Sequence, residues 1–334
     1  MNVSIKDIAK AAGVSHSTVS RALTNTPLVA SKTRRRIERI ASNLGYAPNA
    51  IARGLVTQRT HAIGVIVTTI ADPFVAEVVR GIEAVAGDER YRVVLGNSHS
   101  DPNREVNLVK AMREWRVDGV IVASSRVGGL YLPLLKQIRV PVVLINNQHK
   151  GRYIHSVGID NVEGGLLATR HLLSLEHRVI AYLGGPAEHA ANAERLTGYR
   201  QALAEARIKY DPALVSSGDG RAEGGKQVVD ILQQTPNVTA LFCYNDMTAI
   251  GALHELKRCQ RRIPEDISIV GFDDIAFASY VDPPLTTIQQ PKDDLGRQAM
   301  HMLLDIWNYA KVANITVPVQ LVKRESTAQN RFSN

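Results

Sequence analysis

The chain has 334 residues, 45% of them hydrophobic, and a formal net charge of +8. This length allows two or three domains with a substantial core, and the hydrophobic fraction argues against disorder. The charge is unevenly placed: of 40 basic and 32 acidic residues, ten and two lie in the first 60 residues, which leaves 30 of each in residues 61–334. A polyanionic partner is therefore expected at the N-terminal segment alone.

Export, membrane insertion and metal binding are not expected. The opening residues MNVSIKDIAK lack an apolar signal segment, and no window reaches 18 uninterrupted apolar residues, so we expect a cytoplasmic protein that does not enter a membrane. Cys243 and Cys259 lack CxxC spacing and are expected to stay reduced, and the ten histidines form no HxxxH or Cys/His cluster. Neither a metal nor a tightly held cofactor is predicted.

Three short helices are predicted in the first 45 residues. Apolar positions 5, 8, 9 and 12 have the spacing of one helix face, and Ser4 is placed to cap that helix. After a break at Gly13, Ser15 is expected to cap a second helix that reaches about Leu23. Ser31 is expected to cap a third, whose apolar positions 37, 40, 41 and 44 face inward until Gly45 ends it. Three such helices around one small core are typical of a helix-turn-helix domain.

The second predicted helix, within GVSHSTVSRAL, is apolar on one side and polar on the other. Arg21 can donate two hydrogen bonds to guanine, and His16 and Ser17 lie at the helix start, where base edges come within reach. Phosphate contacts suit the remaining polar groups of this region, namely Ser15, Thr18, Ser20, Asn25 and the run Arg34–Arg36. The alternative is an ordinary solvated helix face beside a charged segment.

A fourth helix is predicted in the stretch YAPNAIARGL, starting near Pro48. Two helical turns are marginal alone in water, so this helix should need a partner. Leu55 beside Ala52 and Arg53 has the character of a minor-groove wedge, because an apolar side chain can unstack a base step while a neighbouring cation binds phosphate. Residues 57–60 are expected to form a linker.

Over its first 57 residues the chain closely resembles the LacI/GalR family of bacterial transcription repressors, in IKDIAKAAGVSHSTVSRAL, the Arg-rich third helix and GYAPNAIARGL. The resemblance implies that positions 16, 17 and 21 read bases, that Leu55 inserts at the centre of a palindromic operator, and that the helix at 50–55 orders when two copies pair on DNA. The DNA contacts expected in this way are Ser15, His16, Ser17, Thr18, Ser20, Arg21, Asn25, Tyr46, Asn49, Ala52, Arg53 and Leu55.

From residue 62 onward, short apolar runs alternate with segments of helix length. The runs are AIGVIV, YRVVLG, DGVIVAS, PVVLIN, SVGID, VIAYLGG, TALFCYND and ISIVGFDD. This alternation predicts an α/β fold with parallel sheets, whose ligands bind beyond the carboxyl ends of the strands. Hydroxyl, amide and carboxylate residues follow those ends, which suits a small polyhydroxylated ligand. They fall into two groups, before and after about Asn161, so two similar lobes with a cleft between them are expected.

The family resemblance continues through IQQPKDDLGRQAM and VKREST and implies the architecture of type I periplasmic sugar-binding proteins. Three crossings between lobes are then expected, near Asn161, Gln290 and Gln320. The implied divisions are a DNA-binding domain at 1–48, a hinge helix and linker at 49–60 and an effector-binding and dimerisation core at 61–334. Within that core the N-lobe would hold 61–160 and 292–319, and the C-lobe 161–291 and 320–334.

Two residues of the core match the family's paired effector contacts: Arg195 and Asp273, a guanidinium and a carboxylate able to grip vicinal hydroxyls. On the residues alone, a helix-surface salt bridge is the favoured interpretation of Arg195 and a turn cap that of Asp273; the family resemblance reverses that preference. Phe74 matches an aromatic that packs against the ligand, although a core role is the alternative. The further candidates are Ser124, Asn146, Asn192, Asn245 and Asp246.

Departures from the family bear on the effector. Asn146 stands where several sugar-responsive members have Asp, and Gly220 stands where the purine-responsive member has a stacking aromatic. The glycine argues against a purine, and a pentose, hexose or small glycoside is expected.

The chain ends without an a/d heptad tail, so a homodimer on a palindromic operator is expected. The function predicted is a repressor gated by effector binding in the cleft, with induction expected and corepression by a non-sugar metabolite as the alternative. An exported sugar-binding protein would lack the basic N-terminal segment. An enzyme is not expected, since Asp273 and Asp274 should point to opposite faces of a strand and no nucleophile motif accompanies them.

Overall fold

The computed structural model describes residues 3–23, 27–46, 59–124, 140–147 and 155–331. The chain forms two compact units, residues 1–60 and residues 61–334. Neither unit has, in those ranges, a helix long and apolar enough to cross a bilayer.

In the part of the first unit that the structure describes there are three helices, α1 (Ile5–Ala12), α2 (His16–Leu23) and α3 (Ser31–Asn43), around a core centred on Ile8, Val19 and Ile37. The predicted cap of α1 is confirmed: the Asp7 amide donates to Ser4 Oγ and the Ser4 amide to the Asp7 carboxylate.

The second predicted cap is also confirmed, because the Thr18 amide donates to Ser15 Oγ over 3.1 Å. The third is wrong: Ser31 is the first residue of α3, and Ala30 occupies the cap position without a side-chain hydrogen bond. Leu44, expected to face inward, lies just past the last turn and is 41% exposed.

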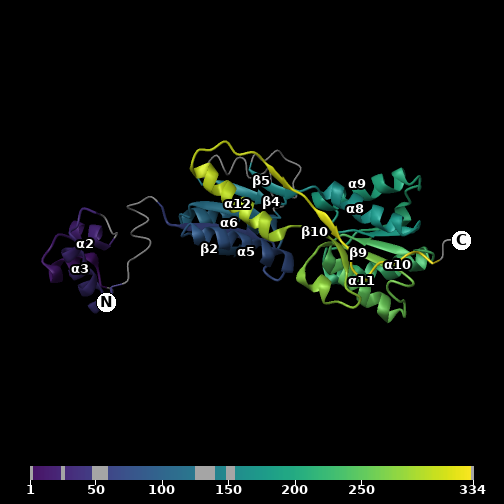
Figure 1. Cartoon of the computed structure of the whole chain (residues 1–334), viewed down its shortest axis with the longest axis horizontal. Helices are drawn as coiled ribbons and strands as arrows, with labels where there is room; N and C mark the ends of the chain where they lie inside the picture. The colour runs from purple at the N-terminus through teal and green to yellow at the C-terminus, as the bar shows by residue number, and fades with distance from the viewer. Residues whose placement is uncertain (1–2, 24–26, 47–58, 125–139, 148–154, 332–334) are drawn as a thin grey trace. The chain divides into compact units, whose positions relative to one another are not determined.

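The first sheet of the second unit is six-stranded and parallel, in the order β11-β5-β4-β3-β1-β2 (Figure 1). One face is covered by α5 (Pro73–Asp88) and α12 (Lys292–Trp307), and the other by α6 (Pro102–Glu114). Its strands are β1 (Ala62–Val67), β2 (Arg92–Asn97), β3 (Gly119–Ala123), β4 (Val142–Ile145), β5 (Ser156–Ile159) and β11 (Ile315–Val317).

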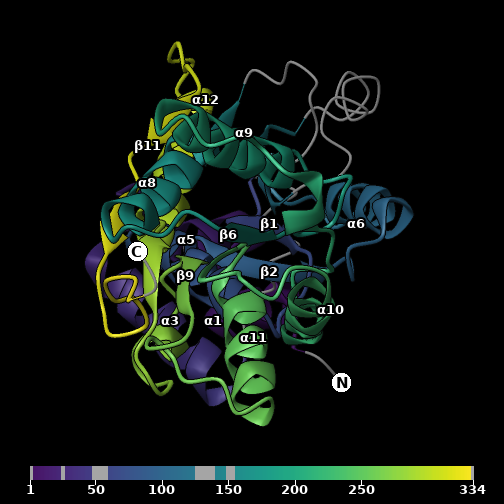
Figure 2. The same cartoon turned by 90° about the vertical axis from the view of Figure 1, so that its right-hand side faces the viewer.

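The second sheet has the order β12-β10-β9-β8-β6-β7, with only β12 antiparallel to its neighbour. Its strands are β6 (Ile180–Leu183), β7 (Val215–Ser216), β8 (Ala240–Cys243), β9 (Ser268–Asp273), β10 (Thr286–Gln289) and β12 (Gln320–Val322). Figure 2 shows α8 (Asn161–Ser174) and α9 (Ala190–Glu205) on one side of this sheet, with α10 (Gln227–Gln234) and α11 (Asp246–Arg258) on the other. Three 3-10 turns complete the description, at Pro212–Leu214, Ala222–Lys226 and Ala276–Ser279.

The predicted α/β class with two sheets is confirmed, and all eight predicted apolar runs contain a strand. The chain passes from the first sheet to the second after β5, returns between β10 and α12, and passes back between β11 and β12.

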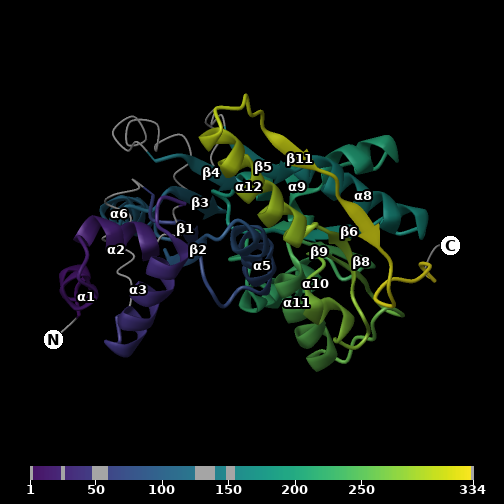
Figure 3. The ribbon, with the colours of Figure 1, turned by 60° about the vertical axis from the view of Figure 1, so that its left-hand side comes forward.

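The return after β10 is anchored by close packing of α12 on α5 (Figure 3). A Cβ on Gly81 would lie 2.0 Å from the Asp293 carbonyl oxygen, and one on Gly296 would lie 2.1 Å from that of Val78. The first turn of α12 is therefore fixed to the lobe of the first sheet.

Candidate functional site

A cleft of about 590 Å³ lies in the second unit, where the carboxyl ends of strands from both sheets face one another. This is the edge at which parallel sheets bind ligands. The first-sheet lobe contributes, among others, Thr68, Thr69, Asp72, Phe74, Ser124 and Asn146. The second-sheet lobe contributes His189, Arg195, Tyr244, Asn245, Asp273 and Gln290, with a loop at 218–221.

Several cleft residues have a backbone conformation that non-glycine residues rarely adopt. Ser124, Asn146 and Asp273, each at the end of a strand, have φ values of 55°, 47° and 114°, and His99 and Ser100 have values of 53° and 60°. Such positions are strained and cluster at functional sites. The strand ends are thus bent to turn their side chains toward the cleft.

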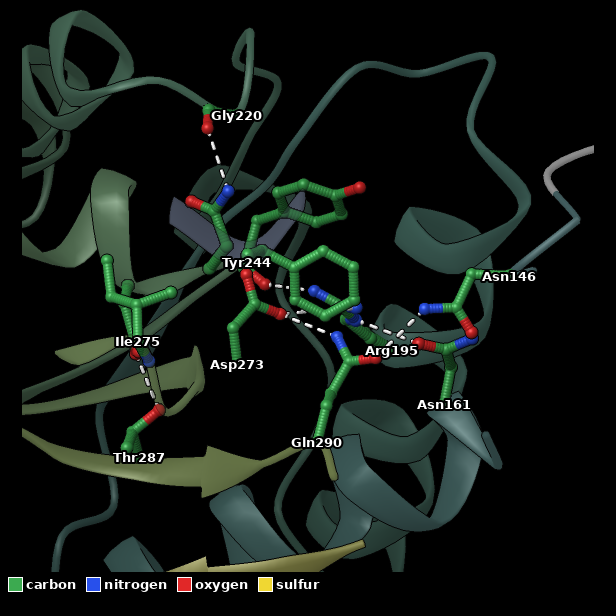
Figure 4. A network of polar contacts seen from close by, with 12 residues as sticks. Asn146, Asn161, Arg195, Gly220, Tyr244, Asp273, Ile275, Thr287 and Gln290 are labelled. Atoms are coloured by element: carbon green, nitrogen blue, oxygen red, sulfur yellow. Dashed lines mark hydrogen bonds and ion pairs between the residues drawn. The ribbon is translucent and has the colours of Figure 1, made fainter. Parts of the chain in front are cut away.

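Arg195 is held from several sides in the wall of the cleft and is 4% exposed (Figure 4). Its Nε donates to Asn161 Oδ1 over 3.0 Å and one terminal nitrogen donates to the Tyr244 carbonyl over 2.5 Å. The guanidinium lies over the rings of Phe272 and Tyr244, 3.6 and 4.8 Å from their centroids. These contacts fix the fork, and the nearest Asp273 oxygen forms a long ion pair with it at 3.9 Å.

Asp273 is the carboxylate that faces this fork. Its Oδ1 accepts a 2.6 Å hydrogen bond from Gln290 Nε2, whose own Oε1 accepts from Asn146 Nδ2 over 3.0 Å, so the chain of contacts joins the two lobes (Figure 4). Burial raises the pKa of Asp273 to about 7, and the Arg195 charge opposes that rise while Asp72 adds to it. Only the ionised form of this carboxyl is purely an acceptor of hydrogen bonds, so its interaction with a ligand should depend on pH near this value.

On the opposite wall, Asp72 caps α5 by accepting from the Phe74 amide over 2.9 Å. Burial raises the pKa of Asp72. Phe74 is 6% exposed and packs in the core of its lobe, so it serves both the core and the cleft wall.

Tyr244 and Asn245 follow β8. The Tyr244 hydroxyl is 3.2 Å from His189 Nδ1, and Asn245 caps α11 while its Nδ2 donates to the Gly220 carbonyl over 2.8 Å. A Cβ on Gly220 would lie 3.1 Å from the Tyr244 ring, so this ring already occupies the space beside that position.

Two predicted effector residues lie outside the cleft wall and are corrected. Asn192 Oδ1 accepts from the Tyr182 hydroxyl and the Gly185 amide, both over 2.9 Å, which commits it to holding the turn after β6. Asp246 is fully buried and accepts from Thr287 Oγ1 and the Ile275 amide. Burial raises the pKa of its carboxyl well above the ordinary range. Both side chains are thus engaged by partners within the second-sheet lobe.

The other six predicted effector residues, Phe74, Ser124, Asn146, Arg195, Asn245 and Asp273, all line the cleft. Sequence reasoning missed Asp72, His189, Tyr244 and Gln290 as cleft residues. Asp72 carried a signal, since an aspartate before a proline is a typical helix start. Gln290 carried none, because it reaches the cleft only through the crossing after β10.

In the first unit, the N-terminal part of α2 carries a cluster of exposed hydroxyls. Ser15 Oγ lies 2.8 Å from both Ser17 Oγ and Thr18 Oγ1, and His16 and Arg21 are exposed on the same helix. Ser20 is half-buried, and Tyr46 packs against the core of the unit. The predicted DNA contacts Asn25, Asn49, Ala52, Arg53 and Leu55, and the predicted hinge helix, lie outside the described residues.

A three-helix unit with an exposed basic surface, joined to a two-lobed binding fold, defines the class of ligand-responsive DNA-binding regulators. Residues 4–49 match bacterial regulatory proteins of the lacI family, and residues 169–327 match a periplasmic binding protein-like domain.

The chain is 36% identical over 334 residues to the HTH-type transcriptional repressor PurR of Klebsiella pneumoniae (strain 342), with 98% of each covered. A lac repressor dimer bound to operator and the anti-inducer ONPF superposes with a TM-score of 0.89 at 30% identity, covering 98% of this chain and all of that one. A lacI-family regulator from Enterococcus faecium with bound ribose gives 0.73 at 33% identity, covering 80% and 99%. The chain belongs to the lacI family of DNA-binding transcriptional regulators.

Proposed function

We propose that this protein is a cytoplasmic repressor that binds a palindromic operator as a homodimer and is released from it by a sugar-like effector. Residues 1–48 would contact the major groove, 49–60 would form the hinge, and 61–334 would bind the effector and the second subunit. The observation that carries the effector assignment is the facing pair Arg195 and Asp273 in a cleft rich in amides and hydroxyls. Donors and acceptors alternate in this wall, which suits vicinal hydroxyls.

The solved relative with bound ribose supports a sugar. A second candidate is a planar heterocycle such as a purine, acting as a corepressor. Two observations favour it: the relatives named PurR, and the Tyr244 ring in the cleft wall beside Gly220. The cleft thus contains an aromatic side chain although position 220 is a glycine. The argument from Gly220 against a stacked ligand is weaker for that reason.

The test is selection of operator sites from a random DNA pool by the purified chain, followed by titration of the selected site with pentoses, hexoses, glycosides and purines. A palindrome with a flexible pyrimidine-purine step at its centre, released by one sugar, is expected. Binding that requires a purine would favour the second candidate. Weak, salt-sensitive binding with no preferred site, with or without either ligand class, would contradict the repressor assignment.

The separate roles of the DNA-binding and effector-binding parts can be tested with Leu55→Gly. This substitution should abolish specific operator binding, because the apolar wedge is lost, while effector affinity stays nearly unchanged. Equal loss of both activities would refute the separation of the DNA-binding and effector-binding parts.

A further inference from the structure

Lys292 is a lysine in an unfavourable place. It is 4% exposed and is the first residue of α12, where the positive end of the helix dipole repels a cation. Burying an ammonium is costly unless it is well compensated. The contacts of its Nζ atom therefore bear on what the residue does.

The hydrogen-bond acceptors of Nζ are two backbone carbonyls. Lys292 Nζ donates to the Asp273 carbonyl over 2.8 Å and to the Asp274 carbonyl over 2.5 Å. The Glu77 carboxylate is farther away, at 3.7 Å, and its side chain is 28% exposed. Hydrogen bonds from a charged donor are the stronger ones, so the main partner of Lys292 is the turn that ends β9.

That turn is strained. Asp273 and Asp274 have consecutive positive φ values of 114° and 56°, a conformation that costs free energy for residues other than glycine. It brings two carbonyl oxygens together on one side and sends the Asp273 carboxylate to the other, toward Gln290 and the cleft (Figure 4). An ammonium between the two oxygens offsets their mutual repulsion.

The contact also joins the two lobes. Lys292 and Glu77 belong to α12 and α5, which pack backbone to backbone on the first sheet, whereas the carbonyls belong to the second. Ile275, next along the chain, is 2% exposed within the hydrophobic core of the first-sheet lobe. The turn at 273–275 thus lies against the opposite lobe, with Lys292 as its polar anchor.

We propose that Lys292 is the positioning residue for the effector-binding carboxylate: it holds the Asp273–Asp274 turn in its strained form and ties that turn to the first-sheet lobe. The ammonium never touches the effector; it acts through the backbone of Asp273. The proposal rests on the proposed function only in naming Asp273 as an effector contact.

The test needs no effector. Hydrogen exchange is measured on the full-length protein and on Lys292→Met, which keeps the length and apolar stem of the side chain but removes the charge. The Gln290 amide donates to the Asp273 carbonyl over 3.3 Å and reports on the turn. We expect its exchange, and that of the Ile275 amide, to become roughly tenfold faster or more, the loss typical of charged hydrogen bonds, while exchange in the strands of both sheets stays unchanged.

Two variants serve as controls. Lys292→Arg keeps the charge and should restore most of the protection, and Glu77→Gln removes only the distant carboxylate and should behave like the unmodified protein. A second measurement is the pKa of the Asp273 carboxyl, obtained by titrating protein that is selectively labelled with carbon-13. Because the Lys292 charge lowers the pKa of Asp273, the Met variant should raise that pKa further and the Arg variant should not.

Unchanged exchange at the turn in Lys292→Met would overturn the proposal, as would an effect of Glu77→Gln equal to that of the Met variant. If the Met variant does not fold, Lys292→Gln takes its place, with the same local acceleration expected and the same unchanged exchange overturning the proposal. If exchange at the turn changes as expected in Lys292→Met but the protein binds neither sugar nor purine, the effector assignment is overturned and the role of Lys292 in holding the turn stands.

Discussion

The two compact units use charge in opposite ways. In the first unit basic residues outnumber acidic ones ten to two, and exposed examples include Lys10, Arg21, Lys32, Arg35 and Arg39. In the second unit the two signs balance, and functionally placed charges are buried among fixed partners, as at Arg195, Asp273 and Lys292. Exposed cations suit a large polyanion that brings its own charges, whereas buried charges suit a small ligand whose groups replace existing contacts.

The sharpest test of this contrast is Arg195→Ala. It removes the guanidinium that is proposed to contact the effector, and it leaves Asp273 without its facing cation in a buried wall. The free energy of unfolding typically falls by about 3–5 kcal/mol when one partner of a buried pair is removed. Effector-dependent release of operator DNA should therefore disappear, while operator binding by the first unit stays within a few-fold in a gel-shift titration.

Arg170→Ala is the matched control for that variant. Arg170 pairs with Glu205 over 2.8 Å, but both side chains are about half exposed, so solvent screening leaves this pair little influence on stability. Release that survives in Arg195→Ala and fails in Arg170→Ala would contradict the placement of the effector.

Breaking the core of the first unit should affect DNA binding alone. Ile37 is fully buried at the centre of that small core, and truncation to alanine should cost the unit about 2–4 kcal/mol. Calorimetry should show the transition of the first unit shifted to lower temperature and that of residues 61–334 unmoved. A common shift of both transitions would show that the units do not fold independently.

On the surface of α2, base reading can be separated from phosphate binding. Arg21→Ala should cost about 1–3 kcal/mol on the selected operator and relax the preference at one base pair. Arg35→Ala, an exposed cation of α3, should weaken binding to all sequences alike and lower the salt dependence by about one ion. If Arg21→Ala weakened every sequence equally, Arg21 would be a phosphate contact instead.

The contrast between the units also governs how much the sequence alone could predict. Helix caps such as Ser4 and Ser15, and strands such as β1 and β9, were predictable because hydrogen-bonding partners three residues apart and apolar runs are local properties. The strands β7, β11 and β12 were missed, since segments of two or three residues carry too little periodicity and form only because neighbouring strands accept them. The four-residue strand β10 was missed because its sequence, TTIQ, is not an apolar run.

For the cleft, position after a strand correctly placed Ser124, Asn146, Asn245 and Asp273. The same criterion wrongly placed Asp246 in the cleft, because position after a strand does not show whether a side chain points toward the cleft or into the core. Asn192 was misplaced because its partners, Tyr182 and Gly185, lie seven to ten residues away on another element. Gln290 and Lys292 depend on a chain crossing that no local pattern reveals.

The smallest expected effect is a pH dependence that only the cleft should show. The pKa of Asp273, about 7 in the ligand-free protein, lies above the ordinary value of 3.8, so this group stabilises the fold fully below about pH 4 and loses that contribution as the pH rises toward 7.

Effector binding has the opposite sign, because a sugar hydroxyl donates to the ionised carboxylate. Calorimetric titration with the releasing sugar should show affinity rising by about tenfold from pH 6 to pH 8 and levelling off above the pKa. Asp273→Asn should bind more weakly at pH 8 and lose the slope, whereas operator binding by the first unit should have no midpoint at this pKa. An affinity that falls as the pH rises would mean that the ligand accepts from the protonated Asp273 carboxyl rather than donating to it, and would favour an effector with lone pairs in place of hydroxyl donors at that position. An affinity that does not change with pH would contradict the placement of Asp273 as an effector contact.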